Sequence, residues 1–301
     1  MSRDRPAPGG LFPLNGTPIP RVGFGMMQLS RKTDGAPGKA QAVELLHQAF
    51  DMGISLFDTA QFYGNGLANE LLRTSFADRR DQVVIASKAG TMQVPGAAIP
   101  VAAAQKPREL RAAVVENLRS LGTDRIDIVN LRRMDFGPRM VAEGDQLVPL
   151  EDQLDEMAAM RAEGMILGIG LSHVTIGQLR TALPLGIACV QNFYNLNHRQ
   201  DEPMLDLCVE NGIAWIPYFA LGAHFRTPPE VTTDPTVQHI ADQLGASPFQ
   251  VGLAWQLAHS PNTLIIPGTS NPDHLAENTR AGYLQLDQEM LAALDAIDTD
   301  R

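Results

Sequence analysis

Short apolar runs alternate with helix-period segments along nearly the whole chain, and this alternation is what most constrains the fold. Eight runs have the continuous hydrophobicity of strands that are buried on both faces, at 21–27, 55–60, 83–89, 126–132, 166–172, 189–195, 213–219 and 264–270. Intervening segments with helical spacing lie at 40–52, 107–121, 150–163, 202–211 and 247–259. We therefore expect an α/β fold, a (β/α)8 or TIM barrel, with all 301 residues in one domain.

Three further segments extend this barrel. Asn15-Gly16 lies between apolar residues in 11–18 and predicts a β-hairpin that plugs the bottom of the barrel. Apolar residues at helical spacing in 286–298 predict an extra terminal helix, and residues 1–10 are expected to be a disordered lead-in. The alternative is an open doubly wound sheet, but no Gly-x-Gly-x-x-Gly motif opens the first helix.

Composition excludes several classes of protein. The net charge of −10 argues against nonspecific nucleic-acid binding and against an anionic membrane surface. No run approaches the roughly 20 apolar residues that span a membrane. Cys189 and Cys208 have no metal-ligand spacing, and the seven histidines are scattered, so we expect a reduced cytoplasmic protein without a metal site. The oligomeric state is not predictable from these data.

Polar side chains gather where the predicted strands end. Asp58 ends the second run, Tyr63 follows it, and Lys88 ends the third. Because the ends of parallel strands meet at one barrel mouth, Asp58 is the natural partner of Lys88, although a buried ion pair alone is weak evidence for function. An ammonium beside a phenol favours ionisation of the phenol, which suits Tyr63 to act as a general acid.

The chain resembles the aldo-keto reductase family over nearly its whole length. The similarity rests on GFGMM, FDTAQFYG, SK, IGLS, VQ and IPGTSNPDHLAEN, in this order. It implies a barrel enzyme that reduces an aldehyde or ketone with a nicotinamide cofactor, and it implies that Asp58, Tyr63 and Lys88 are catalytic.

One position departs from the family pattern. Arg132 stands at the end of the fourth run, where the family usually has a histidine. An arginine stays protonated, so we expect Arg132 to join the catalytic group by hydrogen-bonding the substrate and stabilising negative charge. The alternative is a salt bridge to Asp135 or Glu143 away from the substrate.

The resemblance also implies a set of cofactor-binding residues. Ser172, His173 and Gln191 match positions that hold the nicotinamide carboxamide, and Tyr218 matches the ring that stacks on nicotinamide, although it is equally consistent with a core aromatic. Asn271 and Pro272 predict a helix start whose free N–H groups suit a phosphate. The full predicted set is Gly25, Met26, Met27, Asp58, Ser172, His173, Gln191, Tyr218, Leu221, Gly222, Gly268, Thr269, Ser270, His274, Glu277 and Asn278. We expect NADP(H), with NAD(H) left open.

Two functions remain compatible with these residues. The first is an NADP(H)-dependent reductase of a small-molecule carbonyl, for which Arg132 favours a polar aromatic aldehyde such as pyridoxal. The second is a non-catalytic nicotinamide-binding sensor or accessory subunit on the same barrel. Long loops at 133–149 and 221–235 follow predicted strands, so they are expected to shape the substrate site.

Overall fold

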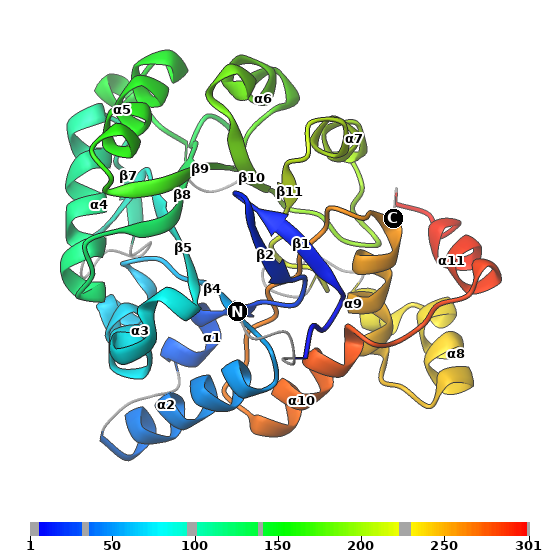
Figure 1. Cartoon of the computed structure of the whole chain (residues 1–301). Coiled ribbons are helices and arrows are strands. Elements are labelled where there is room, and N and C mark those ends of the chain that lie inside the picture. The colour runs from blue at the N-terminus through cyan, green and yellow to red at the C-terminus, as the bar shows by residue number, and fades with distance from the viewer. Residues whose placement is uncertain (1–5, 32–35, 95–100, 138–140, 223–229, 300–301) are drawn as a thin grey trace.

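A parallel sheet curls into a ring in the computed structural model, which describes residues 6–31, 36–94, 101–137, 141–222 and 230–299 (Figure 1). Its seven strands follow the order β11-β10-β9-β8-β5-β4-β3. They are β3 (Phe24–Gly25), β4 (Leu56–Asp58), β5 (Val84–Ala89), β8 (Ile126–Arg132), β9 (Ile166–Ser172), β10 (Ile187–Gln191) and β11 (Ala214–Trp215). All neighbouring pairs are parallel, as in a barrel of alternating strands and helices.

The segment 263–265 closes the ring between β11 and β3. Thr263 bridges Trp215, and Ile265 bridges Val22, both in parallel orientation. The predicted barrel is therefore confirmed, but the predicted strand at 264–270 is present only as bridges. Pro267 contributes to this difference, because proline has no backbone N–H to donate to a neighbouring strand.

Other predicted strands are also shorter than expected. The run at 55–60 is a strand only at Leu56–Asp58, and the strand in the run at 189–195 ends at Gln191. The run at 21–27 ends as a strand at Gly25, and helix α1 (Met26–Arg31) begins directly after it. The run at 213–219 forms a strand only at Ala214–Trp215. Apolar composition extends past these strand ends because the following residues also pack into the core, and Met26 is fully buried.

Helices cover the outside of the ring (Figure 1). They are α2 (Ala36–Asp51), α3 (Leu67–Phe76), α4 (Pro107–Leu121), α5 (Leu150–Ala162), α6 (Ile176–Ala182), α7 (Glu202–Glu210), α8 (Pro235–Leu244), α9 (Pro248–His259), α10 (Pro272–Ala281) and α11 (Gln288–Asp295). Short 3-10 turns are η1 (Tyr63–Gly66), η2 (Ala77–Gln82), η3 (Gly144–Gln146), η4 (Leu183–Leu185) and η5 (Val231–Thr233). The predicted terminal helix corresponds to α11. Among the residues in these described ranges, no helix is long and apolar enough to cross a membrane.

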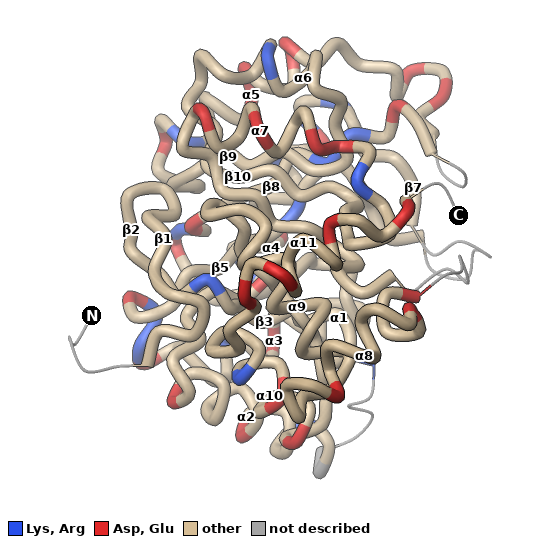
Figure 2. Tube along the Cα trace, turned by 90° about the vertical axis from the view of Figure 1, so that its right-hand side faces the viewer, with Lys and Arg blue, Asp and Glu red and all other residues tan. Residues whose placement is uncertain are grey.

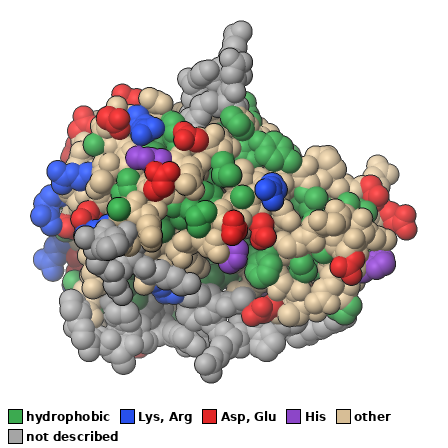
Figure 3. All heavy atoms as spheres, turned by 90° about the horizontal axis from the view of Figure 1, so that it is seen from below, with side chains coloured by type: hydrophobic (Ala, Val, Ile, Leu, Met, Phe, Trp, Pro, Cys, Tyr) green, Lys and Arg blue, Asp and Glu red, His purple; other side chains and the backbone are tan. Residues whose placement is uncertain are grey.

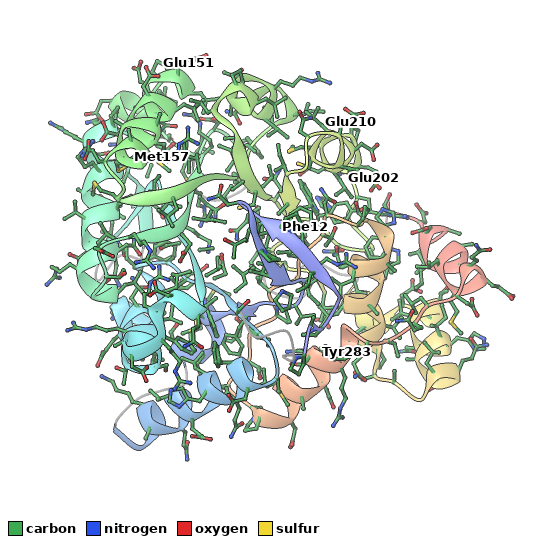
Figure 4. The ribbon with its side chains drawn as sticks, viewed as in Figure 1. Phe12, Glu151, Met157, Glu202, Glu210 and Tyr283 are labelled. Carbon is green, nitrogen blue, oxygen red and sulfur yellow. The ribbon has the colours of Figure 1, made fainter. Side chains whose placement is uncertain are left out.

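The predicted hairpin closes one end of the barrel. Strands β1 (Leu11–Leu14) and β2 (Thr17–Pro20) pair antiparallel, and both turn residues have positive φ, 47° for Asn15 and 79° for Gly16. Figures 1 and 4 show the hairpin, with Phe12 labelled, lying over the centre of the ring. Leu14 and Ile19 are buried against the residues of the barrel interior. The hairpin therefore seals the end of the barrel opposite the strand C-termini.

The lead-in is partly ordered, which differs from the expectation for residues 1–10. The Gly9 N–H donates to the Gly282 carbonyl over 2.9 Å, and Arg21 Nε donates to the Gly9 carbonyl over 2.7 Å. These bonds attach the segment to the end of α10. Residues 1–5 lie outside the described residues.

A second hairpin at the other end of the barrel was not predicted. Strands β6 (Thr91–Gln93) and β7 (Val101–Ala103) pair antiparallel directly after β5. Figure 2 shows β7 at the end of the molecule opposite β1 and β2. The β5 strand therefore ends at a mouth that carries this additional hairpin.

Acidic and basic residues both occur in many separate places along the Cα trace (Figure 2). On the face seen in Figure 3, hydrophobic side chains lie in small groups between acidic and basic ones. The charged residues therefore do not form a single basic surface in these views.

Candidate active site

Strand alternation determines which side chains reach the barrel mouth. Leu56, Ala86 and Ile128 belong to the apolar interior cluster of the barrel. Residues two positions further along the same strands point to the same side, so Asp58, Lys88 and Asn130 continue these interior rows. Arg132 lies two residues beyond Asn130 on β8, on the same side of the strand, and so reaches the mouth. The polar site therefore lies at the C-terminal ends of the strands whose preceding inward-facing residues form the core of the barrel.

Asp58 and Lys88 form a buried ion pair on neighbouring strands. Lys88 Nζ lies 2.6 Å from Asp58 Oδ1, and the two side chains are 8% and 5% exposed. Lys88 Nζ also donates to the Thr59 carbonyl over 3.0 Å. Burial alone lowers the pKa of Lys88, but attraction to Asp58 and Tyr63 outweighs burial and raises that pKa. Lys88 is therefore an ammonium at neutral pH.

Tyr63 lies at the start of a tight turn after β4. The Lys88 Nζ atom is 5.2 Å from the centroid of the Tyr63 ring, which brings the ammonium beside the half-buried phenol. Gly64 follows with φ of 57°, and a Cβ atom there would lie 2.6 Å from the Ser30 carbonyl oxygen. The glycine thus allows the chain to turn against α1 while Tyr63 faces Lys88.

Gln191 contacts the same carboxylate from the opposite side of the barrel. Its Nε2 donates to Asp58 Oδ2 over 2.7 Å, so both oxygens of Asp58 accept a hydrogen bond. The Gln191 Oε1 atom is buried and has no hydrogen-bond partner among the described residues. This unused acceptor suits the NH2 of a carboxamide.

A buried polar network holds strands β4 and β5, which carry the ion pair, from outside the barrel. Thr59 donates to Asn69 over 2.8 Å, and Ser87 donates to Asn117 over 2.7 Å. Asn69 Nδ2 then donates to Asn117 Oδ1 over 3.0 Å. Because Thr59 and Ser87 are adjacent in sequence to the ion pair, this network positions Asp58 and Lys88 relative to helices α3 and α4. Asn69 and Asn117 are indistinguishable from ordinary helix residues in the sequence, so no sequence pattern predicted this network.

Arg132 reaches the mouth of the barrel without an ion-pair partner among the residues that the structure describes. Its Nε atom is buried and likewise lacks a hydrogen-bond partner in those ranges. The neighbouring Arg133 takes the predicted alternative partner, since its Nε and Nη2 atoms each donate to a carboxylate oxygen of Asp135 over 2.8 Å. The strand alternation explains this division, because Arg133 points outward to α5 and contacts Gln153.

His173 and Tyr218 form a second polar group beside Arg132. His173 Nδ1 lies 3.1 Å from the Tyr218 hydroxyl, and His173 Nε2 lies 2.9 Å from the Phe136 carbonyl oxygen. Burial raises the pKa of Tyr218 to about 12. Both imidazole nitrogens therefore have protein partners in this structure. Phe136, which lies in the predicted substrate loop, was not singled out by the sequence.

Ser172 is buried at the end of β9 and is paired in register with both Arg132 and Gln191. The Tyr218 ring is half-buried and stacks near Phe193, with centroids 6.2 Å apart and planes 21° apart. Ser172 and Gln191, two of the residues predicted to bind the nicotinamide carboxamide, are therefore neighbours in the sheet.

The predicted phosphate-binding segment has the expected helix start. Asn271 caps α10 by accepting from the Asp273 N–H over 2.8 Å, and Pro272 is the first helical residue. Thr269 Oγ1 accepts from the Asn271 N–H over 3.0 Å. The carboxylate of Asp273 also lies in this first turn, which disfavours an anion there. Ser270 is half-buried beside the turn.

The other predicted members of this segment differ in exposure. His274 is exposed on the first turn, whereas Glu277 and Asn278 are half-buried on the same helix. The backbone carbonyl of Glu277 accepts from Gln250 Nε2 over 3.2 Å. These residues lie together on α10, whereas the ion pair lies on β4 and β5.

Gly25 and Gly268 contact each other. A Cβ atom on Gly268 would lie 2.4 Å from the Gly25 carbonyl oxygen, and one on Gly25 would lie 2.6 Å from the Ile266 carbonyl oxygen. Because neither glycine has a side chain, the two backbone segments can pack closely where the barrel closes. The Met26 side chain is buried in the core, while Met27 is half-buried.

Leu221 and Gly222 precede a segment outside the described residues. Leu221 is half-buried and packs against the core, and Gly222 has φ of 92°. The predicted loops at 133–149 and 221–235 also include residues 138–140 and 223–229, which lie outside the described ranges. Where the structure describes the chain, no group of three or more His, Cys, Asp or Glu side chains could hold a metal ion.

Comparison with known proteins identifies the family. The family model for the aldo/keto reductase family matches residues 21–299. Pyridoxine 4-dehydrogenase of Escherichia coli (strain K12) is 39% identical over 293 residues, which cover 96% of this chain and 98% of the relative. An uncharacterized oxidoreductase of Schizosaccharomyces pombe is 34% identical, with coverage of 92% and 86%.

Solved structures agree with this assignment. A thermostable aldo-keto reductase in complex with the inhibitor epalrestat has a TM-score of 0.76 and 30% identity, with coverage of 93% of this chain and 95% of that chain. An aldo-keto reductase from Klebsiella pneumoniae in complex with NADPH has a TM-score of 0.79 and 25% identity, with coverage of 96% and 95%. From its sequence and its barrel, this chain belongs to the aldo-keto reductase family.

Proposed function

We propose that the protein reduces an aldehyde or ketone to an alcohol with NADPH, and that Tyr63 is the general acid. The observation that carries this proposal is the buried ammonium of Lys88, which contacts the Asp58 carboxylate at 2.6 Å and lies 5.2 Å from the Tyr63 ring. An ion pair for stability alone does not need a phenol beside it. A phenol beside the ammonium is expected if the site has to donate a proton at the barrel mouth.

The chemistry needs one hydride and one proton. Bound NADPH would supply the hydride to the carbonyl carbon, and the carbonyl oxygen would then need a proton. The Tyr63 hydroxyl then gives its proton to that oxygen, and the Lys88 ammonium stabilises the phenolate that remains. Asp58 keeps Lys88 charged and oriented, since it accepts from both Lys88 and Gln191.

NADPH is supported as the cofactor by two kinds of observation. Aldo-keto reductases of similar structure have been solved in complex with NADPH. In this chain, the buried Gln191 Oε1 has no partner in the described residues, so it can accept from the carboxamide NH2 of nicotinamide. The α10 start with Thr269 and Ser270 is the candidate phosphate contact, although Asp273 opposes it.

A polar aromatic aldehyde such as pyridoxal is the proposed substrate. The relative at 39% identity is named pyridoxine 4-dehydrogenase. Arg132 adds a fixed positive charge near the mouth, and its buried Nε has no partner in the described part of the chain. A phenolate or ring hydroxyl on the substrate would satisfy this donor.

The test is a carbonyl screen with NADPH and with NADH, monitored by loss of the reduced-nicotinamide absorbance. Pyridoxal, para-nitrobenzaldehyde and an aliphatic aldehyde form a minimal panel. Tyr63→Phe is the matched control because it removes one hydroxyl and leaves the ring. We expect it to slow reduction by roughly 10²–10⁴-fold, the usual scale for a positioned general acid, with cofactor binding retained.

Two results would contradict the proposal. Near-normal turnover by Tyr63→Phe would exclude this proton donor. Tight binding of NADPH, measured by fluorescence quenching, without turnover of any carbonyl would favour the sensor or accessory-subunit function instead.

A further inference from the structure

His173 connects two parts of the barrel mouth that are distant in sequence. Its ring bonds to the Phe136 carbonyl after β8 and to the Tyr218 hydroxyl after β11. The ring also stacks on Phe136, with centroids 4.1 Å apart and planes 26° apart. One imidazole therefore bridges the segment that follows Arg132 and the aromatic expected to face nicotinamide.

The backbone at His173 is held in an uncommon conformation. Its φ is 56°, which is rare for a residue other than glycine. The His173 N–H donates to the Gln191 carbonyl over 3.0 Å, which anchors this turn to β10. Non-glycine residues persist in such conformations only when the surrounding contacts determine them, so the ring contacts are part of what defines this turn.

The two ring contacts determine the tautomer. A backbone carbonyl only accepts, so His173 Nε2 must carry the hydrogen that is shared with Phe136. In a neutral ring Nδ1 then has a lone pair, and the Tyr218 hydroxyl donates to it. Burial lowers the pKa of His173, and the charge of Arg132 adds to this effect, while Asp135 and Asp201 oppose it. The neutral ring with hydrogen on Nε2 is consistent with every contact.

We propose that His173 is a positioning residue, which fixes the Tyr218 phenol and the Phe136 segment across the mouth, and that it is not a ligand of the nicotinamide carboxamide. This inference rests on the proposed function only in that Tyr218 and Arg132 line the proposed site. Both ring nitrogens are used within the protein, so a carboxamide would have to displace one of two hydrogen bonds to reach the imidazole.

Nuclear magnetic resonance of the imidazole tests the tautomer without any activity measurement. Long-range ¹H–¹⁵N correlation at neutral pH should show one neutral ring with hydrogen on Nε2, which disappears in His173→Asn. In Tyr218→Phe the Nδ1 resonance of this ring should shift, because its hydrogen-bond donor is lost. A ring with hydrogen on Nδ1, or a Nδ1 resonance that does not change in Tyr218→Phe, would overturn the proposal.

Three substitutions separate the contact of His173 with Phe136 from its contact with Tyr218. His173→Gln extends an amide toward the Nε2 position and keeps a donor for Phe136, but it lacks the Nδ1 acceptor. His173→Asn keeps an acceptor near the Nδ1 position and lacks the longer reach. Tyr218→Phe removes the donor on the other side and preserves the ring.

The kinetic readout is kcat/KM for para-nitrobenzaldehyde with NADPH, together with the dissociation constant of NADPH. His173→Gln and Tyr218→Phe should each lower kcat/KM by about fivefold, the scale of one hydrogen bond, and the double variant should lose no more than either alone. His173→Asn should lower kcat/KM less than His173→Gln does, because its side chain keeps an acceptor for the Tyr218 hydroxyl.

A direct carboxamide contact predicts a different pattern. His173→Gln would then weaken NADPH binding about tenfold, and its effect would multiply with that of Tyr218→Phe, which would overturn the positioning role. If the wild-type protein turns over no carbonyl, the proposed function fails, while the resonance of His173 still decides the contact to Tyr218.

Discussion

Removal of the Lys88 ammonium should separate the structural role of the buried ion pair from its chemical role. At 2.6 Å and an effective dielectric constant of 20, the attraction between Lys88 and Asp58 is about 6 kcal/mol. The cost of removing two charges from water is several kcal/mol for each ion, so the pair contributes little net stability. The large effect comes from breaking the pair, because one charge is then left buried.

Lys88→Met should therefore lower the free energy of unfolding by about 3 kcal/mol, at the low end of the range for an unpaired buried charge. The low end is expected because Gln191 still donates to Asp58 over 2.7 Å and so partly satisfies the carboxylate. Thermal denaturation should show this as a decrease in Tm of about 6–9 °C. Carbonyl reduction should fall by roughly 10²-fold or more, since the Tyr63 phenolate loses its stabilising charge.

The matched control is the double variant Asp58→Asn with Lys88→Met, which contains neither charge and has side chains of similar shape. Its stability should return to within about 1 kcal/mol of wild type, because no unpaired charge remains. Its activity should stay as low as that of Lys88→Met. Wild-type stability in the single variant, or recovered turnover in the double variant, would refute this account of the ion pair.

Three further outcomes are expected. Asn117→Ala should reduce kcat with little change in NADPH affinity, because it breaks the network behind the ion pair; steady-state kinetics and cofactor titration test this. His259 has a raised pKa, since hydrogen bonds and attraction to Glu202 and Asp295 outweigh burial, which lowers it. Its contribution to stability should be complete below the unfolded value of 6.5 and lost as pH rises through the folded value, so the stability difference between wild type and His259→Gln should shrink with increasing pH in urea denaturation. Gly64→Ala should destabilise the protein and slow reduction, because its Cβ would lie 2.6 Å from a backbone oxygen at φ of 57°; a normal Tm and kcat would contradict the proposed role of this turn.

The fold could be predicted because its main signal is local. Each strand buried on both faces is a continuous apolar run, and each helix has its own periodicity and end signals, as at Pro107 and Gly122 in α4. Strand alternation also brings Asp58 and Lys88 to the same mouth once a parallel barrel is assumed. The strand at 264–270 was overestimated because its apolar residues are needed for packing, whereas ladder formation also requires N–H donors that Pro267 lacks.

Contacts between segments that are distant in the sequence could not be predicted in this way. The Phe136 carbonyl that binds His173 is a backbone group, so no side-chain pattern identifies it. Asn69 and Asn117 are 48 residues apart and are joined only when α3 and α4 pack together. The hairpin of β6 and β7 likewise depends on the pairing of two strands of only three residues each, which is too short for a periodic signal in the sequence.

Arg132 provides the test of substrate selection in this site. Its register with Ser172 and the alternation along β8 direct it to the mouth, and its buried Nε has no partner within the described ranges. A hydrogen bond to a charged group contributes more than one between neutral groups, so Arg132→Leu should lower kcat/KM for pyridoxal by about tenfold more than for an uncharged benzaldehyde. Arg132→Lys keeps the positive charge without the planar fork, and we expect it to recover only part of this selectivity. Arg132→His, which introduces the residue usual in the family, should retain partial activity with a changed ratio between the two aldehydes. If all three variants lower both rates by the same factor, Arg132 does not contact the substrate ring, and its role is confined to the charge that it adds beside His173 and Tyr218.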